Sequence, residues 1–410
     1  MDIAIIGGGA AGFFAAINAK ENFPAAKVVI FEKSDHVLAK VKVSGGGRCN
    51  VTNGCGEITT LAAAYPRGGR ELKRAFRIFS NHDVMQWFEA RGVALVVQED
   101  NCVFPASQNS QTIIDCLTSQ ARKLEITIKR GWAVKAIKPL TGNADITTRL
   151  QLEFANQGCQ SQTFDKVIVT TGGSPKGSGL VWLENLGHKI SPPVPSLFTF
   201  KMPDEKVADL MGIVVENALV SVQGTKFKTA GSLLITHWGM SGPAILKLSA
   251  IAARALSEKK YNFKVQVNWT GVQNYDAVVV QLHKIRSEHP KKILPNFRPF
   301  SVPERLWSCL LQKGELPVAK KWGELGKNGL HRLANLLTND AYAVDGQTQF
   351  RDEFVTCGGV SLESINFKTM QSKCCTNLYF AGEVMDIDGI TGGYNFQAAW
   401  TTAFIAARLS

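Results

Sequence analysis

The sequence DIAIIGGGAAGFFAAINAKENFPAAKVVIFE, residues 2–32, decides the fold of this 410-residue chain. It reads as an apolar strand, a glycine turn, a helix and a second apolar strand that ends on an acid. The first glycine permits a tight turn, the third lets the backbone approach a pyrophosphate, and the last lets the helix pack close to the sheet. Free N–H groups at the helix N-terminus attract phosphates, and the acid can accept bonds from ribose hydroxyls. The stretch therefore predicts an adenine-dinucleotide site formed by Gly7, Gly9, Ala10, Ala11, Gly12, Glu32 and Lys33.

Length and composition describe a globular protein of more than one domain. With 410 residues, 45% of them hydrophobic and 20% charged, the chain can build two or three domains. Its longest apolar runs are shorter than a membrane span, and the first strand begins at once, so neither a membrane anchor nor a secretion signal is expected. The nine cysteines, an odd number in a long chain without an expected secretion signal, indicate reduced thiols in the cytoplasm. They include no C-x-x-C pair, so neither a zinc ribbon nor a redox-active dithiol of that spacing is expected, and no metal site is predicted.

The net charge of +12 is compatible with an anionic partner. Lysine and arginine are nevertheless spread along the chain, and their clusters are the short pairs Lys259-Lys260, Lys291-Lys292 and Lys320-Lys321. We interpret these pairs as solvated surface and assign part of the charge to an anionic cofactor or substrate. A small molecule is therefore the expected substrate, and a nucleic acid is not expected.

A second glycine cluster, KVKVSGGGRCNVTN at residues 40–53, follows the acid directly. Three consecutive glycines expose backbone N–H groups, the arginine can pair with phosphate, and the asparagine can bond the edge of a planar heterocycle. The alternative is a flexible surface loop. We favour a cofactor loop, because the chain runs back across the dinucleotide at this point. Its expected contacts are Ser44, Gly45, Gly46, Gly47, Arg48, Cys49 and Asn50.

Helical and strand patterns alternate up to residue 173. Apolar spacing predicts a helix over 70–92, a hairpin formed by 93–97 and 102–105, and a helix over 110–123. Short strands at 126–128, 132–137 and 150–154 suggest a small antiparallel meander inserted into a doubly wound sheet. The run 165–173 reads as a buried strand that ends on Thr170, Thr171 and Gly172, as in FAD folds of the glutathione-reductase type. The alternative for this run is a core strand with a plain glycine turn.

The pattern of predicted secondary structure changes after residue 192. The run Pro192–Pro195 is stiff and marks an expected domain boundary. Short strand patterns follow, interrupted by helical patterns at 271–337. We therefore predict an α/β protein with a Rossmann-like FAD-binding domain and an inserted β-barrel domain that itself carries a small helical insert. The expected boundaries are 1–192 and 365–410 for the FAD-binding domain, 193–270 and 338–364 for the barrel, and 271–337 for the helical insert.

The last informative stretch, NLYFAGEVMDIDGITGGYNFQ at 377–397, precedes a predicted helix over 398–408. A strand that closes on a glycine and an acid can approach the pyrophosphate and ribityl groups. The paired glycines then start a helix whose N-terminus would stabilise the negative charge of a reduced flavin. The alternative is an ordinary capped C-terminal helix. The expected contacts are Gly382, Glu383, Gly393, Tyr394 and Asn395.

The glycine turn, the run SGGGRCN at 44–50, THWGMSGP at 236–243 and the C-terminal GE and GGYN together resemble the BaiN/RdsA family of bacterial flavoproteins. The resemblance runs over nearly the whole chain. It implies a glutathione-reductase-type FAD domain, a β-barrel insert, a helical insert within that barrel, and NAD(P)/FAD-dependent oxidoreductase activity. Members are associated with aminoacetone oxidation or with reduction of conjugated steroid double bonds. In related FAD folds the strand that holds Val134 offers backbone bonds to adenine.

The expected function is an FAD-dependent oxidoreductase that transfers hydride to or from an unidentified small molecule, with NAD(P)H as a candidate reductant. No second strand–GxGxxG–helix unit is present to hold a nicotinamide dinucleotide. The alternative is a flavin-bearing protein that binds or modifies RNA, and steeply salt-dependent RNA binding would distinguish it. Candidate catalytic residues are His237 and Tyr394. The alternative for His237 is a structural bond to the backbone in a tight turn, and the alternative for Tyr394 is a packing role. The oligomeric state stays open.

Overall fold

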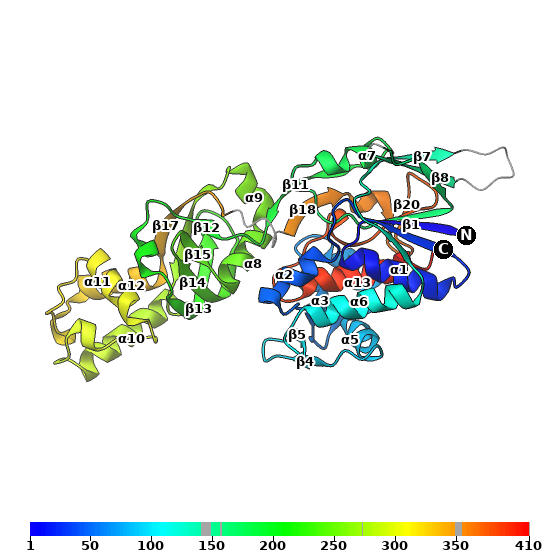
Figure 1. Cartoon of the computed structure of the whole chain (residues 1–410). Helices are drawn as coiled ribbons and strands as arrows, with labels where there is room; N and C mark the ends of the chain where they lie inside the picture. The colour runs from blue at the N-terminus through cyan, green and yellow to red at the C-terminus, as the bar shows by residue number, and fades with distance from the viewer. Residues whose placement is uncertain (141–148, 156–157, 273, 349–354, 410) are drawn as a thin grey trace. The chain divides into compact units, whose positions relative to one another are not determined.

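A computed structural model describes residues 1–140, 149–155, 158–272, 274–348 and 355–409. The chain forms two compact units, Met1–Ser196 with Phe350–Ser410 and Leu197–Gln349 (Figure 1). We call them the first and second units. Among the described residues, no helix combines the length and the apolar character that crossing a bilayer requires.

The first unit is built on a seven-stranded sheet with the order β19-β20-β21-β10-β1-β2-β6. Strand β1 lies between β10 and β2 and pairs in parallel with both, and β21 and β6 extend the parallel part on either side. Both neighbours of β1 are apolar runs, as expected of parallel strands buried on both faces. The strands are β1 (Asp2–Ile6), β2 (Lys27–Phe31), β6 (Thr127–Lys129), β10 (Lys166–Val169), β19 (Ile365–Asn366), β20 (Gln371–Ser372) and β21 (Leu378–Phe380).

The first and last helices of the chain pack against each other in this unit. Helix α1 (Ala10–Asn22) contacts both α13 (Tyr394–Ala406) and α6 (Gln111–Lys123), and the three lie side by side in Figure 1. The ring of Phe14 is 4.4 Å from that of Trp87 and 5.2 Å from that of Trp400, measured between centroids. Burying one such aromatic side chain contributes about 1.5–3 kcal/mol. The two ends of the chain therefore share one aromatic core.

Three smaller sheets complete the first unit, with the orders β3-β5-β4, β7-β8-β9 and β11-β18. The antiparallel sheet β7-β8-β9 contains the predicted strands 132–137 and 150–154 as β7 and β8, whereas the predicted strand 126–128 is β6 of the parallel sheet. The strands are β3 (Thr52–Asn53), β4 (Leu95–Val97), β5 (Cys102–Pro105), β7 (Val134–Leu140), β8 (Arg149–Phe154), β9 (Gln162–Phe164), β11 (Ile190–Ser196) and β18 (Val355–Val360). The helices are α2 (Ala39–Gly47), α3 (Ile58–Ala63), α4 (Gly69–Ala75), α5 (Asn81–Glu89) and α7 (Val181–Glu184), with 3-10 turns η1 (Ser178–Leu180), η5 (Leu362–Ser364) and η6 (Gly382–Val384).

Two local expectations differ from the structure. The single helix expected over 70–92 is two helices, because Ser80 starts α5 with a capping box: its hydroxyl accepts from the Asp83 N–H, and the Asp83 carboxylate accepts from the Ser80 N–H at 2.6 Å. The run Pro192–Pro195 lies inside strand β11, where it pairs with β18 across a register shift. A β-bulge is one of the few places in a sheet that accepts proline.

The second unit is a six-stranded antiparallel sheet with the order β12-β15-β14-β13-β16-β17. A bridge between Phe200 and Gln347 joins the edge of β12 to the chain just after β17, so the sheet nearly closes on itself. Helix α8 packs on β13 and β14. The elements are β12 (Phe200–Lys201), η2 (Lys206–Leu210), β13 (Val214–Val222), β14 (Lys228–Thr236), β15 (Gly239–Ser241), α8 (Pro243–Ile251), α9 (Ala253–Glu258), β16 (Asn262–Asn268) and β17 (Asp340–Asp345).

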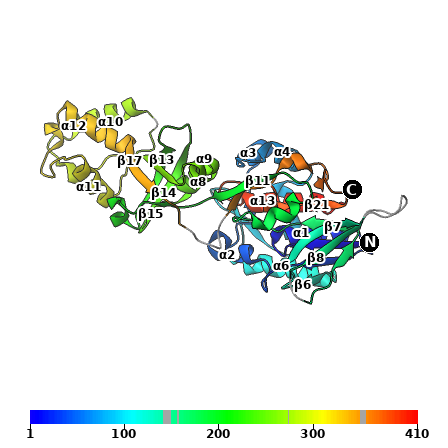
Figure 2. The same ribbon diagram turned by 90° about the horizontal axis from the view of Figure 1, so that it is seen from above.

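A helical segment lies between β16 and β17. It comprises α10 (Tyr275–Glu288), η3 (Leu294–Asn296), α11 (Glu304–Lys313), η4 (Trp322–Glu324) and α12 (Lys327–Thr338), which Figure 2 shows from a second direction. Helix α12 contacts both α10 and α11. The buried rings of Trp307 and Trp322 lie nearly parallel with centroids 6.3 Å apart, in a small apolar core of this segment.

Candidate functional site

The turn between β1 and α1 leaves no room for side chains at two of its glycines. A Cβ on Gly7, whose φ is +113°, would lie 2.5 Å from the carbonyl oxygen of Thr170. A Cβ on Gly12 would lie 1.9 Å from the carbonyl oxygen of Gly7. These distances are shorter than any van der Waals contact, so glycine is required for β1, β10 and α1 to approach one another. In contrast, a Cβ on Gly9 would meet no atom of the described residues within 4 Å, which leaves open space in front of the turn.

The N-terminus of α1 borders that open space. Gly9 is the N-cap, with an extended backbone and no side chain that caps the helix. The first N–H groups of a helix, here from Ala10 onward, have no partner inside the helix and carry a positive partial charge. The first turn contains no acidic residue that would compete for them. The arrangement suits a phosphate anion.

The Glu32 carboxylate lies at the edge of the same turn. It accepts a hydrogen bond from the Gly8 N–H at 2.7 Å and two from Ser34, from its N–H at 2.9 Å and its hydroxyl at 2.8 Å. The glycine turn and the acid, which are 24 residues apart in the sequence, are therefore in direct contact in the fold. The neighbouring Lys33 is exposed.

The end of β10 supports the turn from the other side. The buried hydroxyl of Thr170 donates to the carbonyls of Ile6 and Gly7, at 3.0 Å each. Thr171 is exposed, and Gly172 takes a left-handed conformation with φ +73°. Thr170 is therefore placed to hold the glycine turn in position.

The second glycine cluster begins beside the first. The N–H of Leu38, the N-cap of α2, donates to the carbonyl of Gly8 at 2.9 Å. Helix α2 is broken at Ser44, and the glycines Gly45–Gly47 are all left-handed, with φ of +57°, +67° and +83°. Within the part of the chain that the structure describes, a Cβ on Gly46 or Gly47 would meet no atom within 4 Å. The expected cofactor loop is thus the irregular end of a helix that borders open space.

Arg48 and Cys49 are held by protein groups. The guanidinium of Arg48 lies over the ring of Phe104 at 4.1 Å, and its Nε donates to the carbonyl of Gly45 at 3.2 Å. Cys49 is fully buried with φ +63°, and burial raises the pKa of its thiol to about 12. A thiol with such a pKa stays protonated at neutral pH and is a poor nucleophile.

The C-terminal glycines are bonded to the end of the second glycine cluster. The Asn50 amide accepts from the Gly393 N–H at 3.1 Å and donates to the Thr52 carbonyl at 2.9 Å. The Asn53 amide donates to the Gly392 carbonyl at 3.1 Å. Since a Cβ on Gly393 would lie 2.3 Å from the Thr52 carbonyl oxygen, only glycine fits at this N-cap of α13. The structure thus brings together two clusters that the sequence separates.

The two residues that follow Gly393 differ in the hydrogen bonds that they make. The Asn395 amide bonds the backbone of Gly389 twice, accepting from its N–H at 2.8 Å and donating to its carbonyl at 3.0 Å. Tyr394 receives a hydrogen bond on its backbone carbonyl from the Tyr65 hydroxyl at 2.6 Å, and the two rings meet edge to face. Burial raises the pKa of the Tyr394 phenol to about 12. Asn395 therefore shapes the loop before α13, while the half-buried phenol of Tyr394 stays protonated at neutral pH.

Gly382 and Glu383 lie beside the start of α1. A Cβ on Gly382, whose φ is +77°, would lie 2.9 Å from the Cβ of Ala11. The Glu383 carboxylate is 2.7 Å from the Lys40 ammonium and accepts from the Thr356 N–H at 2.8 Å. The C-terminal glycine and acid therefore lie at the N-terminal end of α1, as a pyrophosphate site requires, although the acid is bound to protein groups.

Val134 begins strand β7, close to the ribose acid. The backbone carbonyl of Glu32 accepts from the N–H of Trp132 at 2.8 Å, two residues before Val134. Val134 itself is half-buried and pairs with Phe154. Its strand therefore starts from the side of the turn on which Glu32 lies.

The two catalytic candidates lie in different units. His237 is exposed in the turn between β14 and β15 of the second unit, with its ring against that of Trp238 at 3.8 Å. Tyr394 belongs to the first unit, which also holds the glycine turn. Within the first unit, only Tyr394 of this pair is available beside the dinucleotide groups.

Sequence reasoning missed the buried polar contacts behind the site. The Thr52 hydroxyl donates to Gln397 at 2.5 Å, and both side chains are fully buried. The Arg67 guanidinium pairs with the buried Asp388, whose carboxylate also accepts from the Ser196 hydroxyl at 2.7 Å. Burial raises the pKa of Asp388, and the arginine opposes this effect. No signal in the sequence marked these pairs, because Thr52 and Gln397 stand 345 residues apart in the chain and Arg67 and Asp388 stand 321 apart.

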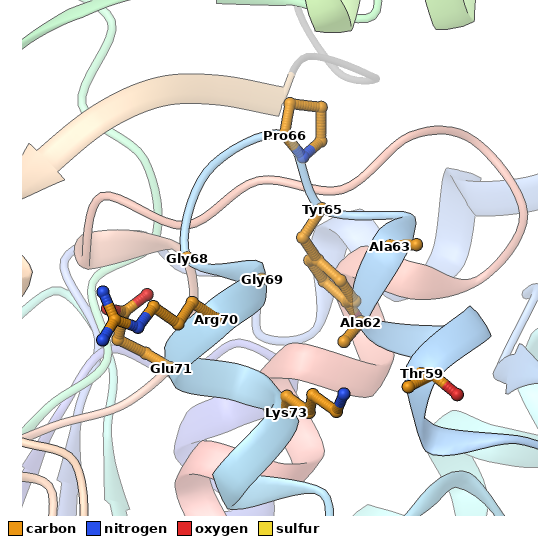
Figure 3. Close-up of a pocket in the computed structure, with 10 residues that line it drawn as sticks. All are labelled: Thr59, Ala62, Ala63, Tyr65, Pro66, Gly68, Gly69, Arg70, Glu71 and Lys73. Atoms are coloured by element: carbon orange, nitrogen blue, oxygen red, sulfur yellow. The ribbon is translucent and has the colours of Figure 1, made fainter.

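A shallow depression opens nearby on the surface between α3 and α4. Figure 3 shows Arg70, Glu71 and Lys73 on α4 and the ring of Tyr65 between the two helices. It is lined by Thr59, Ala62, Ala63, Tyr65, Pro66, Gly68, Gly69, Arg70, Glu71 and Lys73. None of these residues was expected at the site, and α4 is too short to offer a strong dipole.

The groups around the glycine turn fit FAD. The open space before Gly9 and the uncapped start of α1 suit the pyrophosphate, and Glu32 suits a ribose. The glycine-rich end of α2 and the Gly393 cap of α13 are bonded to each other through Asn50. These five features lie in one unit and involve residues from both ends of the chain.

Comparisons with known proteins identify the family and the fold of the chain. The family model described as HI0933-like protein Rossmann domain matches residues 1–409. The chain is 30% identical to the ribosomal RNA dihydrouridine synthase of Escherichia coli, over 99% of this chain and 97% of that protein. It is 26% identical to the 3-dehydro-bile acid delta(4,6)-reductase of Clostridium scindens, over 99% and 98%. Among solved structures, the 3-ketosteroid delta1-dehydrogenase of Sterolibacterium denitrificans is similar with a TM-score of 0.52 at 12% identity, over 99% and 98% of the two chains.

Proposed function

Because the chain belongs to the HI0933-like family of Rossmann proteins, we propose that it reduces a carbon–carbon double bond conjugated with a carbonyl, and that its substrate is a uridine of ribosomal RNA. The chain is an FAD-dependent oxidoreductase, with its FAD in the first unit. What carries the proposal is the 30% identity to the ribosomal RNA dihydrouridine synthase along nearly the whole of both chains. The sequence alone favoured a small-molecule substrate over RNA. Because of this similarity, we propose RNA as the first candidate substrate and a small molecule as the second.

The names of the two relatives describe one type of chemistry. A 3-dehydro-bile acid with double bonds at positions 4 and 6 is a conjugated ketone. The uracil ring has a double bond conjugated with a ring carbonyl, and dihydrouridine is its saturated form. When such a conjugated double bond is reduced, a hydride adds to its carbon that is farther from the carbonyl. A proton adds to its other carbon, which is nearer to the carbonyl. The common requirement is a bound hydride donor and a protonated acid.

The chain supplies groups for each requirement. FAD, when reduced, provides the hydride. The start of α1 binds the pyrophosphate, and Glu32 orients the ribose. We assign proton donation to the phenol of Tyr394, whose pKa of about 12 keeps it protonated at neutral pH. Tyr65 fixes the backbone of this residue by donating to its carbonyl at 2.6 Å.

We further propose that a nicotinamide dinucleotide reduces the flavin without a second Rossmann unit of its own. The motif of strand, GxGxxG and helix occurs once in the sequence, at residues 2–22. A reductant that binds the same face as the substrate would leave before the substrate enters. Such an enzyme shows ping-pong kinetics.

A small conjugated ketone is the second candidate substrate, favoured by the similarity to the bile-acid reductase. One anaerobic experiment compares the two. Purified protein is reduced with NADH or NADPH, and flavin reoxidation is followed after addition of unmodified ribosomal RNA transcribed in vitro or of a 4-ene-3-ketosteroid. Reoxidation by RNA, with dihydrouridine found in the product by mass spectrometry, supports the proposal. Reoxidation by the steroid alone would assign the enzyme to small molecules, and protein that binds no FAD would overturn the flavoenzyme itself.

A further inference from the structure

The helical segment of the second unit carries a large share of the positive charge. Residues 271–337 contain eleven lysines and arginines against five aspartates and glutamates. Their excess of six is half of the net charge of +12 of the whole chain. Charge of one sign on a short segment creates a local field that attracts polyanions. In the sequence these cations include separate lysine pairs. Whether the pairs can bind one ligand together depends on where the fold places them.

The fold joins two of the lysine pairs. The N–H of Trp322 donates to the carbonyl of Lys292 at 2.9 Å, and the N–H of Leu294 donates to the carbonyl of Lys320 at 2.9 Å. A bridge between Ile293 and Lys321 lies between these bonds. The two chain segments are therefore paired side by side, which brings the pair Lys291-Lys292 of one segment next to the pair Lys320-Lys321 of the other. We call Lys291, Lys292, Lys320 and Lys321 the lysine cluster.

This pairing is anchored by the core of the helical segment. Leu294 and Trp322 are fully buried, and the Trp307 indole donates to the Leu294 carbonyl at 2.9 Å. The Gly323 N–H donates to the Pro290 carbonyl at 3.0 Å and extends the paired region. Because the backbone under the lysine cluster is already ordered, a ligand would have to immobilise only the side chains.

The ammonium groups of the lysine cluster are free of strong ion pairs. Lys291, Lys292 and Lys321 are exposed, and Lys320 is half-buried. In the described part of the chain, no carboxylate lies within 4.0 Å of the Nζ atoms of Lys291, Lys292 or Lys320. Lys321 is 4.0 Å from Glu324, with both side chains more than half exposed, a contact that contributes little. The charges are thus available to an external partner.

We propose that the lysine cluster binds the phosphate backbone of the RNA substrate. The inference rests on the proposed function and adds to it a docking surface in the unit that lacks the glycine turn. Lysine is a point charge that contacts phosphates without reading base identity, so this surface positions RNA while other groups select the uridine. A further cation lies close to it: the Arg286 guanidinium donates to the Leu325 carbonyl at 3.4 Å, next to η4.

The test compares two quadruple variants of equal charge. In the first, the lysine cluster is neutralised by K291Q, K292Q, K320Q and K321Q. In the second, four other exposed lysines of the same unit are neutralised by K226Q, K228Q, K259Q and K260Q. FAD content, visible spectrum and melting temperature establish that both variants are folded. Filter binding then measures affinity for ribosomal RNA transcribed in vitro at a series of salt concentrations.

We expect the first variant to lose at least about tenfold in affinity near 0.1 M salt, with a salt slope shallower by about three, because four phosphate contacts are lost. The second variant should bind as the parent does. In turnover with RNA, the loss should appear in KM and leave kcat unchanged, since the lysine cluster belongs to the second unit and the glycine turn to the first. Steroid-driven or dye-driven reoxidation of the flavin should be equal in all three proteins.

The outcomes separate this inference from the proposed function. Equal losses in both quadruple variants would show that only total charge matters and would overturn the lysine cluster as a docking surface. RNA reduction with normal KM in the first variant would do the same while leaving the proposed function intact. If polyglutamate displaces RNA as well as unlabelled RNA does, the surface is a site for acidic protein, which also contradicts the inference. A parent protein that neither binds nor reduces RNA would overturn the proposed function, and the inference with it.

Discussion

The side-chain oxygen of Asn50 accepts a hydrogen bond from the backbone N–H of Gly393 at 3.1 Å. This bond joins the end of the second glycine cluster to the N-cap of the C-terminal helix. The same amide donates to the Thr52 carbonyl, so one side chain fixes both the strand β3 and the start of α13. The segment next to the expected flavin position is therefore held by protein bonds before any ligand binds.

Replacing Asn50 should loosen this junction. Asn50→Ala leaves the Gly393 N–H and the Thr52 carbonyl without partners, at a cost of about 1–3 kcal/mol in the free energy of unfolding. Thermal unfolding with and without FAD measures the loss. Asn50→Asp is the matched control for the donor side of the amide: it keeps an acceptor for Gly393 but sets a carboxylate oxygen against the Thr52 carbonyl, so it should not recover the lost stability. Equal stability of Asn50→Ala and the parent would show that the contact is dispensable.

Two glycines of the first turn should respond differently to alanine. Gly12→Ala places a methyl group 1.9 Å from the Gly7 carbonyl, so we expect poor folding or a loss of several kcal/mol. Gly9→Ala meets no protein atom within 4 Å, and its φ of −90° suits alanine. It should fold normally and bind FAD at least about tenfold more weakly, because the methyl group occupies the approach to the pyrophosphate. Melting temperature and FAD titration of the apoprotein separate the two effects, and unchanged FAD affinity of Gly9→Ala would contradict the site.

Tyr394→Phe tests the proposed proton donor. The variant should keep FAD and its rate of reduction by the nicotinamide, while substrate reduction slows by about a hundredfold, within the usual contribution of an acid. Because the pKa of this phenol is about 12, the parent rate should show no ionisation of Tyr394 between pH 6 and 9. Single-turnover measurements of both half-reactions decide the matter. A normal rate of substrate reduction would leave Tyr394 with a packing role against Tyr65 alone.

His237→Ala tests the second catalytic candidate. The side chain is exposed in a hairpin turn of the second unit, so its removal should leave the fold and FAD content intact. A slower half-reaction is expected if the residue donates or accepts a proton. Stopped-flow reduction and reoxidation measure both steps. Rates equal to those of the parent would reject the catalytic role, and loss of fold and FAD together would make His237 a structural residue.

A buried histidine should make stability depend on pH. Burial lowers the pKa of His188, whose ring contacts the Leu183 carbonyl at 2.9 Å and the Ser372 hydroxyl at 2.7 Å. The unfolded chain therefore binds a proton at higher pH than the folded one, and stability falls as the pH drops below the ordinary value of about 6.5. Melting temperatures at pH 7.5 and 5.5 measure the fall. His188→Gln removes the titrating group, so its melting temperature should change less over this range, whereas an identical pH dependence would assign the effect to other groups.

Local rules of chain geometry made part of the site predictable. Gly7 and Gly12 must be glycine because of atoms within one βαβ unit, and Glu32 meets the turn because the next parallel strand ends beside it. Such requirements act over short distances along the chain, and they appear in the sequence as fixed spacings. The α/β class followed for the same reason, since apolar runs and helical periods are local patterns.

The remaining features depend on where the chain goes between those motifs. Arg48 was expected to pair with phosphate, yet it lies over Phe104, a residue from a later hairpin. The apolar periodicity predicted one helix, but Ser80 caps the start of a second helix and so divides the predicted helix in two.

The sequence by itself determined the dinucleotide turn and the class of fold, because sterics and periodicity are local. Only the tertiary structure decided that Asn50 meets Gly393 and that two lysine pairs join into one cluster. Those contacts arise from backbone hydrogen bonds between segments far apart in the chain, and the spacing of residues in a single sequence does not encode which distant carbonyl an N–H will meet.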